Sequence, residues 1–289
     1  MRRAGGPKTG GSNPLSPTKR NFSILPYSFF TMQNKNKFQT IEKFVHLGKA
    51  DLHIHSNYSD GKPTIEEITQ YVEEKTDLDV IAITDHDTIE GALKAKRIVD
   101  GDNYQFDLIV GEEVSTTSGH ILGLFLTEKI EPGQSVEATI REIHQQGGLA
   151  IAAHPFMHVK FDQERMYTMD GIGAGKLYQN RFILDGVETV NATPTLTDEN
   201  LGATAMNRTL LRLTETGSSD GHILEAIGKG YTVFQGRTAE DLRKSIKNHQ
   251  TQAIYGHWTI LALLKYLYFF IPTGIRILWS RVFNRNPRY

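Results

Sequence analysis

The sequence predicts an α/β fold in which parallel strands and helices alternate around a (β/α) barrel. Between residues 49 and 215, short β-rich runs alternate with periodic helical stretches, which is the pattern of successive βα units. The 289 residues are enough for one such barrel, which folds as a single domain of roughly 200–250 residues. Polar side chains also recur where the predicted strands end, and in a parallel barrel this edge carries the active site.

The strands are predicted from short apolar and β-branched runs bounded by turn signals. They cover residues 50–55, 80–84, 108–115, 120–126, 149–153 and 186–190, and a further short strand leads into residues 218–222. Helices are predicted at residues 64–74, 89–100 and 136–146, the first opened by Pro63-Thr64 and the last closed by Gly147-Gly148. A final strand and helix, in TVFQGRTAEDLRKSIKNHQ, close the domain.

The net charge of −1 conceals a segregation of charge along the chain. Residues 1–46 carry eight Lys or Arg and one acid, Glu42, whereas residues 257–289 carry five Lys or Arg and no acid. The segment between them therefore holds 19 of the 32 basic and 32 of the 33 acidic residues, a net charge of −13. An acidic body suits a carboxylate-rich metal site, and basic ends suit anionic lipid or nucleic acid.

These shifts in composition predict three parts. Residues 1–46 are expected to be a disordered basic extension, because they are rich in Gly, Pro and Ser and poor in apolar residues. Residues 47–256 form the predicted catalytic domain, and residues 257–289 are an apolar and basic tail. The apolar patch at residues 22–30 is interrupted by Ser23, Pro26 and Ser28, which is unlike a signal peptide, so a cytoplasmic location is expected.

The apolar tail leaves three interpretations open. In the first, the tail is an interfacial membrane segment that places the protein peripherally on anionic lipid. In the second, it is a packing or dimerising helix. In the third, it is a tilted or broken segment that spans the membrane. Its longest charge-free run, residues 266–275, is shorter than the roughly 20 residues that cross a bilayer. Pro272 favours two short segments over one straight helix.

The polar residues at the strand ends indicate a metal site. His53 and His55 are two residues apart in DLHIH, so on a strand they point to the same face and can bind one ion. Because the chain has no cysteine, any metal must use nitrogen and oxygen ligands. Other residues placed at or just beyond strand ends are Asp85, His86, Glu113, His154, Glu188 and Asp220.

Several neighbours of these residues have more than one interpretation. Asp51 and Asp85 flank candidate ligands, and they either accept hydrogen bonds from imidazole N–H groups or cap surface turns. Asp87 is expected to cap the helix that follows it. Glu188 and Asn191 are either structural or a supporting part of the site.

Six ordered motifs resemble the polymerase and histidinol phosphatase (PHP) family of phosphoesterases over roughly residues 49–250. They are DLHIHSNYSDG, ITDHDTIEG, GEEVS, SGHILG, AHP and GSSDGH. The resemblance implies a distorted seven-stranded (β/α) barrel of the PHP type. It also implies hydrolysis of phosphate esters by two or three divalent ions, of which Mn²⁺, Fe²⁺ and Zn²⁺ all suit mixed His and carboxylate ligands.

Transferred residue by residue, the family pattern implies three ion sites. One ion would lie between His53, His55, Glu113 and Asp220. A second would share Glu113 with His120 and His154, and a third would bind Asp60, His86 and His222. The residues expected to take part in catalysis are Asp60, His86, Glu113, Asp220 and His222. The GxExS register favours Glu113 over Glu112, since adjacent residues on a strand face opposite sides.

The expected reaction is hydrolysis of a small phosphomonoester, such as a nucleotide 3′- or 5′-phosphate, by attack of metal-bound hydroxide. One alternative is a 5′-end exonuclease on short single-stranded RNA or DNA, although the acidic body disfavours nucleic acid. Another is a non-catalytic, membrane-attached module that binds a phosphorylated ligand. Candidate substrate contacts are Arg181, Arg208 and His158, and Lys62 is a further candidate phosphate contact. The oligomeric state stays open.

Overall fold

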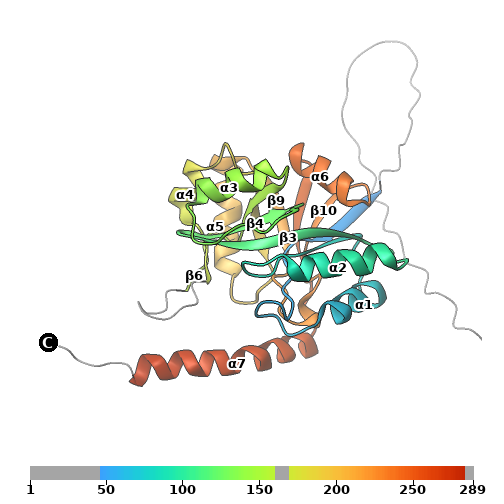
Figure 1. Ribbon diagram of the computed structural model, residues 1–289. Coiled ribbons are helices and arrows are strands. Elements are labelled where there is room, and N and C mark those ends of the chain that lie inside the picture. Colours follow the sequence, from blue (N-terminus) through green and yellow to red (C-terminus); the bar gives the residue numbers. More distant parts are fainter. Residues whose placement is uncertain (1–45, 160–168, 284–289) are drawn as a thin grey trace, which may run out of the picture. The chain divides into compact units, whose positions relative to one another are not determined.

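A mixed sheet of nine strands forms the centre of the protein (Figure 1). The computed structural model describes residues 46–159 and 169–283, with side chains for residues 46–157 and 171–271. The strand order is β11-β10-β1-β2-β3-β4-β5-β8-β9, and β6 and β7 form a separate pair. The α/β prediction is therefore confirmed, but the count of seven strands is wrong, because β10 and β11 follow the last predicted ligands and join the same sheet.

The first strand ends at Asp51 and not at residue 55, so His53 and His55 lie beyond it, and β6, β7 and β11 have no predicted counterpart. The other strands overlap the predicted runs, and the structure gives the following strand bounds. They are β1 Leu47–Asp51, β2 Val80–Ile83, β3 Asp107–Thr116, β4 Gly119–Leu124, β5 Leu149–Ala152, β6 His158–Val159, β7 Met169–Asp170, β8 Gly186–Asn191, β9 Thr214–Ser218, β10 Gly230–Gln235 and β11 Thr251–Tyr255.

The sheet is only partly parallel, which corrects the prediction of a fully parallel sheet. Strands β1, β2 and β3 are parallel, as are β5, β8 and β9. Strand β4 runs antiparallel to both β3 and β5, because the two residues between β3 and β4 are too few for a crossover connection. Strands β10 and β11 form a second antiparallel pair, and β10 pairs with β1.

Threonine hydroxyls nearly close the sheet into a barrel where β9 passes β10 and β11. Gly217 N–H donates to Thr232 Oγ1 at 3.0 Å, and the same hydroxyl donates to the carbonyl oxygen of Gly217 at 2.9 Å. The hydroxyl of Thr251 on β11 donates to the carbonyl oxygen of Glu215 at 2.6 Å. These side chains satisfy backbone groups of β9 that a regular ladder would otherwise pair.

Helices cover the outer face of the sheet (Figure 1). The first one begins after Thr64, whose side chain forms a reciprocal capping box with Glu67. Asp87 does not cap the next helix, because its carboxylate accepts from Ser115 N–H at 2.7 Å. The helices are α1 Ile65–Lys75, α2 Glu90–Gly101, α3 Val136–Gln145, α4 Gly173–Gln179, α5 Thr197–Met206, the π-helix η1 Asn207–Leu211, the 3₁₀-helix η2 Leu224–Ala226, α6 Ala239–Lys247 and α7 Ile260–Phe283.

Alternation along the strands divides the core into two clusters. On β2, Ile81 and Ile83 pack with the cluster that contains the buried faces of α1, α2 and α3. Val80 and Ala82 point to the other side and pack with Phe234 and the buried residues of α6. This period of two is the expected geometry of strands that are buried on both faces.

The apolar tail contains one long helix. Helix α7 runs from Ile260 to Phe283 without a break, so the expectation of two short segments is wrong. A proline removes one backbone hydrogen bond, and the remaining bonds of the helix continue on either side of it. In the part of the chain that the structure describes, no helix is both long and apolar enough to cross a membrane.

Because β9 and β10 approach each other closely where the barrel nearly closes, we expect the start of β10 to tolerate no side chain larger than that of glycine. A Cβ on Gly230 would meet the carbonyl oxygen of Ser218, which is backbone and cannot turn away. We expect Gly230→Ala to lower the free energy of unfolding by about 1–3 kcal/mol, measured by urea titration.

Gly101 at the end of α2 provides the matched control, because a Cβ there meets no atom within 4 Å. Gly101→Ala should leave stability unchanged or raise it by up to about 1 kcal/mol. Equal effects of the two substitutions would contradict the close approach of β9 and β10.

Candidate metal centre

Nine side chains from six segments meet at one end of the barrel. His53 and His55 follow β1, His86 follows β2, His154 follows β5, and Asp220 and His222 follow β9. Glu113 lies within β3, and His120 lies near the start of β4, which is antiparallel and therefore begins at this same end. Seven of the nine are buried, whereas the side chains of Asp60 and His86 keep 44% and 26% of their surface exposed. The structure thus brings together every residue that the sequence marked as a candidate metal ligand.

Glu113 is the centre of this cluster. Its Oε1 lies 2.9 Å from His120 Nδ1 and 2.9 Å from His154 Nε2. Its Oε2 lies 3.1 Å from His53 Nε2, 3.3 Å from His55 Nε2 and 3.3 Å from His86 Nδ1. One carboxylate therefore contacts five imidazoles, and each of its oxygens faces a different group of them.

Two further carboxylates, Asp220 and Asp60, approach His55 and also reach His222, which Glu113 does not contact. Asp220 Oδ1 lies 3.2 Å from His55 Nε2, 3.6 Å from His53 Nε2 and 3.6 Å from His222 Nδ1. Asp60 lies 3.2 Å from His222 Nε2 and 3.6 Å from His55 Nδ1. His55 therefore connects the group around Asp220 to the group around Asp60.

The spacing of these atoms suits bound divalent ions. Atoms held about 2.0–2.2 Å from one ion lie roughly 3.0–3.6 Å from each other, and most of the separations in the cluster fall in this range. Four sets of three or four donors lie within 4.8 Å of one another: His55, Asp60, His86 and His222; His53, His55 and Asp220; His53, Glu113 and His154; and His86, Glu113 and His120.

His55 gives an independent test of the fit. Its side chain is fully buried, yet neither ring nitrogen makes a hydrogen bond of good geometry with any described residue. His120 Nδ1 and His154 Nδ1 are also buried without such a bond. Buried nitrogens without hydrogen bonds are costly in a folded protein, and a bound cation removes that cost for the lone pairs that face it. The donor set of imidazoles and carboxylates fits Mn²⁺, Fe²⁺ or Zn²⁺.

The carboxylates dominate the electrostatics of the cluster. Burial lowers the pKa of His53 and of His55, but the nearby Glu113 and Asp220 raise both pKa values by more, for His55 to about 10. Burial also opposes ionisation of Glu113 and Asp220, yet the surrounding histidines hold the pKa of each carboxyl well below its usual range. Without metal, His53 and His55 are therefore protonated imidazoles paired with carboxylates.

His86 differs from the other histidines of the cluster. Burial is the main cause that lowers its pKa, to about 4, and the neighbouring His55 and His120 lower it further, against the opposing effect of Glu113. His86 is therefore neutral at neutral pH and has a lone pair available for an ion.

Glu188 holds two of the ligands in place from behind. Its Oε1 lies 3.2 Å from His53 Nδ1 and accepts from the Ser218 hydroxyl at 2.6 Å. Its Oε2 accepts from the His154 backbone N–H at 2.7 Å and from Asn191 Nδ2 at 3.1 Å. Asn191 Nδ2 also donates to Asp220. Glu188 and Asn191 thus have the supporting part that the sequence left open, and Ser218 is a contact that no motif indicated.

Asp51 and Asp85 position loops and do not contact imidazoles, which corrects one of the two roles considered for them. Asp51 accepts from the backbone N–H groups of Ser219 at 2.9 Å and Gly228 at 2.8 Å. Asp85 accepts from Ser56 N–H at 2.7 Å and from the Ser59 hydroxyl at 2.6 Å. Both are fully buried, so they are not surface caps either. Each ties a ligand-bearing loop to a strand end.

The first turns of α7 form a wall beside the cluster, which sequence reasoning missed. The ring centroids of Phe269 and Phe270 lie 6.4 Å and 6.0 Å from that of His222. Tyr266 is buried, and its burial, together with the nearby Asp220, raises the pKa of its hydroxyl. Trp258 Nε1 donates to the carbonyl oxygen of Ala192 at 3.0 Å and anchors the segment that leads into the helix.

Two of the predicted substrate contacts, Arg181 and Arg208, are not at the cluster. Arg181 lies between α4 and β8, where it stacks on Tyr178 and Phe182. Arg208 pairs with Glu215 near the start of β9 at 2.9 Å and 3.1 Å. Arg181 precedes β8 and Arg208 precedes β9, so both lie where these strands begin. The metal ligands lie at the opposite end of the barrel, where the parallel strands finish. The backbone of His158 begins β6, but its side chain lies outside the part that the structure describes.

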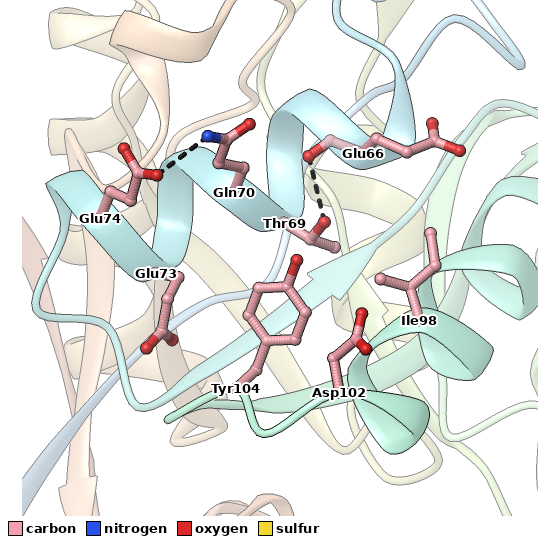
Figure 2. Close-up of a pocket in the computed structure, with 8 residues that line it drawn as sticks. All are labelled: Glu66, Thr69, Gln70, Glu73, Glu74, Ile98, Asp102 and Tyr104. Atoms are coloured by element: carbon pink, nitrogen blue, oxygen red, sulfur yellow. Dashed lines mark hydrogen bonds between the residues drawn. The ribbon is translucent and has the colours of Figure 1, made fainter.

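A hollow on the outer surface is a poor candidate for the reaction. It has a volume of about 590 Å³ and lies between α1 and the end of α2 (Figure 2). None of the nine ligands lines it, and its polar lining is mainly carboxylates, which repel phosphate. Its lining residues are Glu66, Thr69, Gln70, Glu73, Glu74, Ile98, Asp102 and Tyr104.

Comparison with known proteins agrees with the arrangement of the cluster. A family model described as PHP-associated matches residues 207–251, which include β9 and the segment that carries Asp220 and His222. The uncharacterized protein MJ1587 of Methanocaldococcus jannaschii is 40% identical over 155 residues, which cover 50% of this chain and 82% of that protein. The chain belongs to the PHP family.

Two solved structures share the fold of this PHP protein. One is a two-domain protein from Bacteroides vulgatus that contains a PHP-like metal-dependent phosphoesterase; it has a TM-score of 0.58 and 20% identity, over 78% of this chain and 70% of its own. The other, PsfC from Pseudomonas syringae, has a TM-score of 0.58 and 18% identity, over 80% of this chain and 99% of its own. PHP proteins are generally metal-dependent hydrolases that use divalent ions.

Divalent metal should stabilise the fold through Glu113. Adding Mn²⁺ or Zn²⁺ at about 100 times the dissociation constant should stabilise the wild type by about 2.7 kcal/mol, seen as a higher melting temperature. Glu113→Gln should abolish this shift. Glu112→Gln is the matched control, because burial raises the pKa of Glu112 to about 7 and its carboxylate accepts only from Ile130 N–H. Equal metal responses of the two variants would contradict the central position of Glu113.

Metal uptake should release protons at pH 7.5. His55, with its pKa raised to about 10 by Asp220 and Glu113, carries a proton at this pH in the metal-free protein and must lose it to bind an ion. The apparent metal affinity should therefore rise as the pH rises from 6 toward 9. Calorimetry in buffers of different ionisation enthalpy measures the protons released, and an uptake that releases none would show that the imidazoles are already neutral.

Proposed function

We propose that the protein hydrolyses a small phosphomonoester, such as a nucleotide 3′- or 5′-phosphate, at the cluster around Glu113. The observation that carries the proposal is the contact of one buried carboxylate with five imidazoles, beside two further carboxylates that approach His55 and His222. Glu113, with its two oxygens facing different imidazoles, would help to hold more than one divalent ion, and such ions would supply the charge stabilisation that phosphate ester hydrolysis needs.

Three groups of residues would hold the ions. His53, His55 and Asp220 form one, Glu113 with His120 and His154 forms a second, and Asp60 with His86 and His222 forms a third. Divalent ions bound there would supply Lewis acidity and lower the pKa of water to about 7. The protein's own part is to fix the donors: Glu188 orients His53, Asp51 holds the loop that carries Asp220 and His222, and Asp85 holds the loop that carries Asp60.

The exposed edge of the cluster is where substrate would enter. Asp60 and His86 are its most exposed members, and both belong to the third group. Lys62 lies two residues after Asp60, and its backbone N–H donates to the carbonyl oxygen of His222 at 2.9 Å. Its ammonium group lies 5.3 Å from the ring centre of Phe269. Lys62 is therefore the candidate cation for the phosphate, in the place that Arg181 and Arg208 do not fill.

Charge favours small substrates over nucleic acid. A groove for several nucleotides needs a track of cations and stacking aromatic rings. The segment 47–256 has a net charge of −13, and the aromatic rings of α7 lie against His222 instead of lining an open track. A single phosphate bound to cations at the cluster needs no such track.

The decisive experiment is phosphate release by the full-length protein with Mn²⁺. The panel contains mononucleotides, 3′,5′-bisphosphates and a short 5′-phosphorylated RNA. We expect release from the small esters, and His53→Ala and Asp220→Asn should each lower turnover by at least 10³-fold because they remove ligands. Cleavage of RNA alone would replace the proposal with a 5′-end nuclease.

Two controls distinguish a panel that lacks the right substrate from a cluster that does not catalyse the reaction. Lys62→Gln should raise KM more than it lowers kcat if the ammonium group binds the phosphate, whereas Lys94→Gln on α2 should change neither. Chelation followed by re-addition of metal should abolish and restore turnover. Tight metal binding without turnover on the whole panel would favour a module that binds phosphorylated ligands without hydrolysing them.

A further inference from the structure

Helix α7 has apolar side chains on two opposite faces. One face packs on the body, where Ala262 and Tyr266 are buried and Phe269 and Phe270 lie near His222. The opposite face keeps large apolar side chains in solvent, with Leu261 63%, Leu264 58% and Tyr268 79% exposed. The exposed set falls at the spacing of one helical stripe: Ile260, Leu261, Leu264, Leu267, Tyr268 and Ile271.

Such a helix lacks a partner on one side. A helix that is apolar all round is normally buried in a protein core or in lipid. Within the described residues, nothing covers the exposed stripe, whereas the other face is anchored by Trp258 and by an ion pair between Lys265 and Glu225. The stripe is therefore a surface built for contact with an apolar partner.

The charge of this region identifies the kind of partner. Helix α7 contains Lys265, Arg276 and Arg281 and no acid, and residues 257–289 together carry five Lys or Arg. The segment 47–256 carries a net charge of −13, so an anionic surface repels most of the body and attracts the basic segment that contains the helix. The apolar stripe and the basic residues of the same segment together suit the surface of a bilayer that contains anionic lipid.

We propose that α7 lies in the headgroup layer of an anionic bilayer, with the stripe from Ile260 to Ile271 facing the acyl chains. The stripe is a convex ridge on one helix, and a bilayer surface accepts such a ridge without a complementary groove. Tyr268, at the middle of the stripe, has the amphipathic ring that favours headgroup depth.

Docking in this way also places the metal centre at the membrane. Phe269 and Phe270 lie beside His222 on the inner side of α7. The outer side of the same helical turn carries Tyr268 and Ile271. The width of one helix, about 10 Å, then separates the lipid from the metal ligands. The proposal rests on the surface of α7 and not on the proposed phosphatase activity.

The test is flotation of the full-length protein with vesicles of phosphatidylcholine alone or with 30 mol% phosphatidylglycerol. We expect the wild type to float with the anionic vesicles. The double variant Leu261→Asp/Leu264→Asp should lose at least tenfold in apparent affinity. Leu201→Asp on α5 is the matched control, because Leu201 is 65% exposed and lies on a different helix from the stripe; it should float like the wild type. Circular dichroism and metal binding confirm that each variant is folded.

Three outcomes would overturn the proposal. The wild type does not float with either vesicle. The double variant floats as well as the wild type, which would place the attraction on the basic residues 1–46, where eight Lys or Arg occur. Sedimentation without vesicles shows a dimer that the double variant dissociates, in which case a second copy of the chain covers the stripe.

Discussion

The arrangement of the site depends on the contact between the Glu113 carboxylate and five imidazoles. Each of these rings is largely removed from water, and without a central negative charge their protonated forms would repel one another in a poorly solvated space. Glu113 lies inside β3, where it pairs with Leu122 of β4 and forms an isolated bridge with His86, so its position is fixed by backbone pairing before any ion binds. The rest of the barrel serves to bring the other ligands to this one carboxylate.

The irregular parts of the sheet have a direct part in that assembly. Because β4 runs antiparallel, a residue at its beginning lies at the same end as residues that follow parallel strands, and this brings His120 to Glu113. Asp220 adopts a positive φ of 52° and His154 one of 21°, conformations that cost energy outside glycine. Hydrogen bonds from Asn191 to Asp220 and from the His154 backbone to Glu188 offset that cost where the ligands must point inward.

The sequence predicted the strands of this site well because each ligand motif is attached to a buried apolar run that marks its strand. It also indicated the right glutamate of the adjacent pair, since alternation sends Glu112 toward Ile130 and Glu113 toward the histidines. Two arginines were misplaced although the information was present: Arg181 and Arg208 precede strands, and such loops lie at the opposite end of a barrel. The antiparallel direction of β10 and the threonine contacts that close the barrel depend on long-range pairing, which no local pattern encodes.

The packing of α7 could not be read from its sequence because the helix is apolar on every side, so no periodicity distinguishes the face that is buried. The structure resolves this by placing Phe269 and Phe270 beside His222 and leaving Leu264 outside. One helix therefore connects the end of the barrel that carries the candidate metal ligands with an external surface. Any partner that shifts α7 changes the surroundings of His222, and by thermodynamic linkage occupancy of the metal centre then changes the affinity for that partner by the same factor. The two faces of this helix provide a route for reciprocal regulation between the metal centre and the outside of the protein.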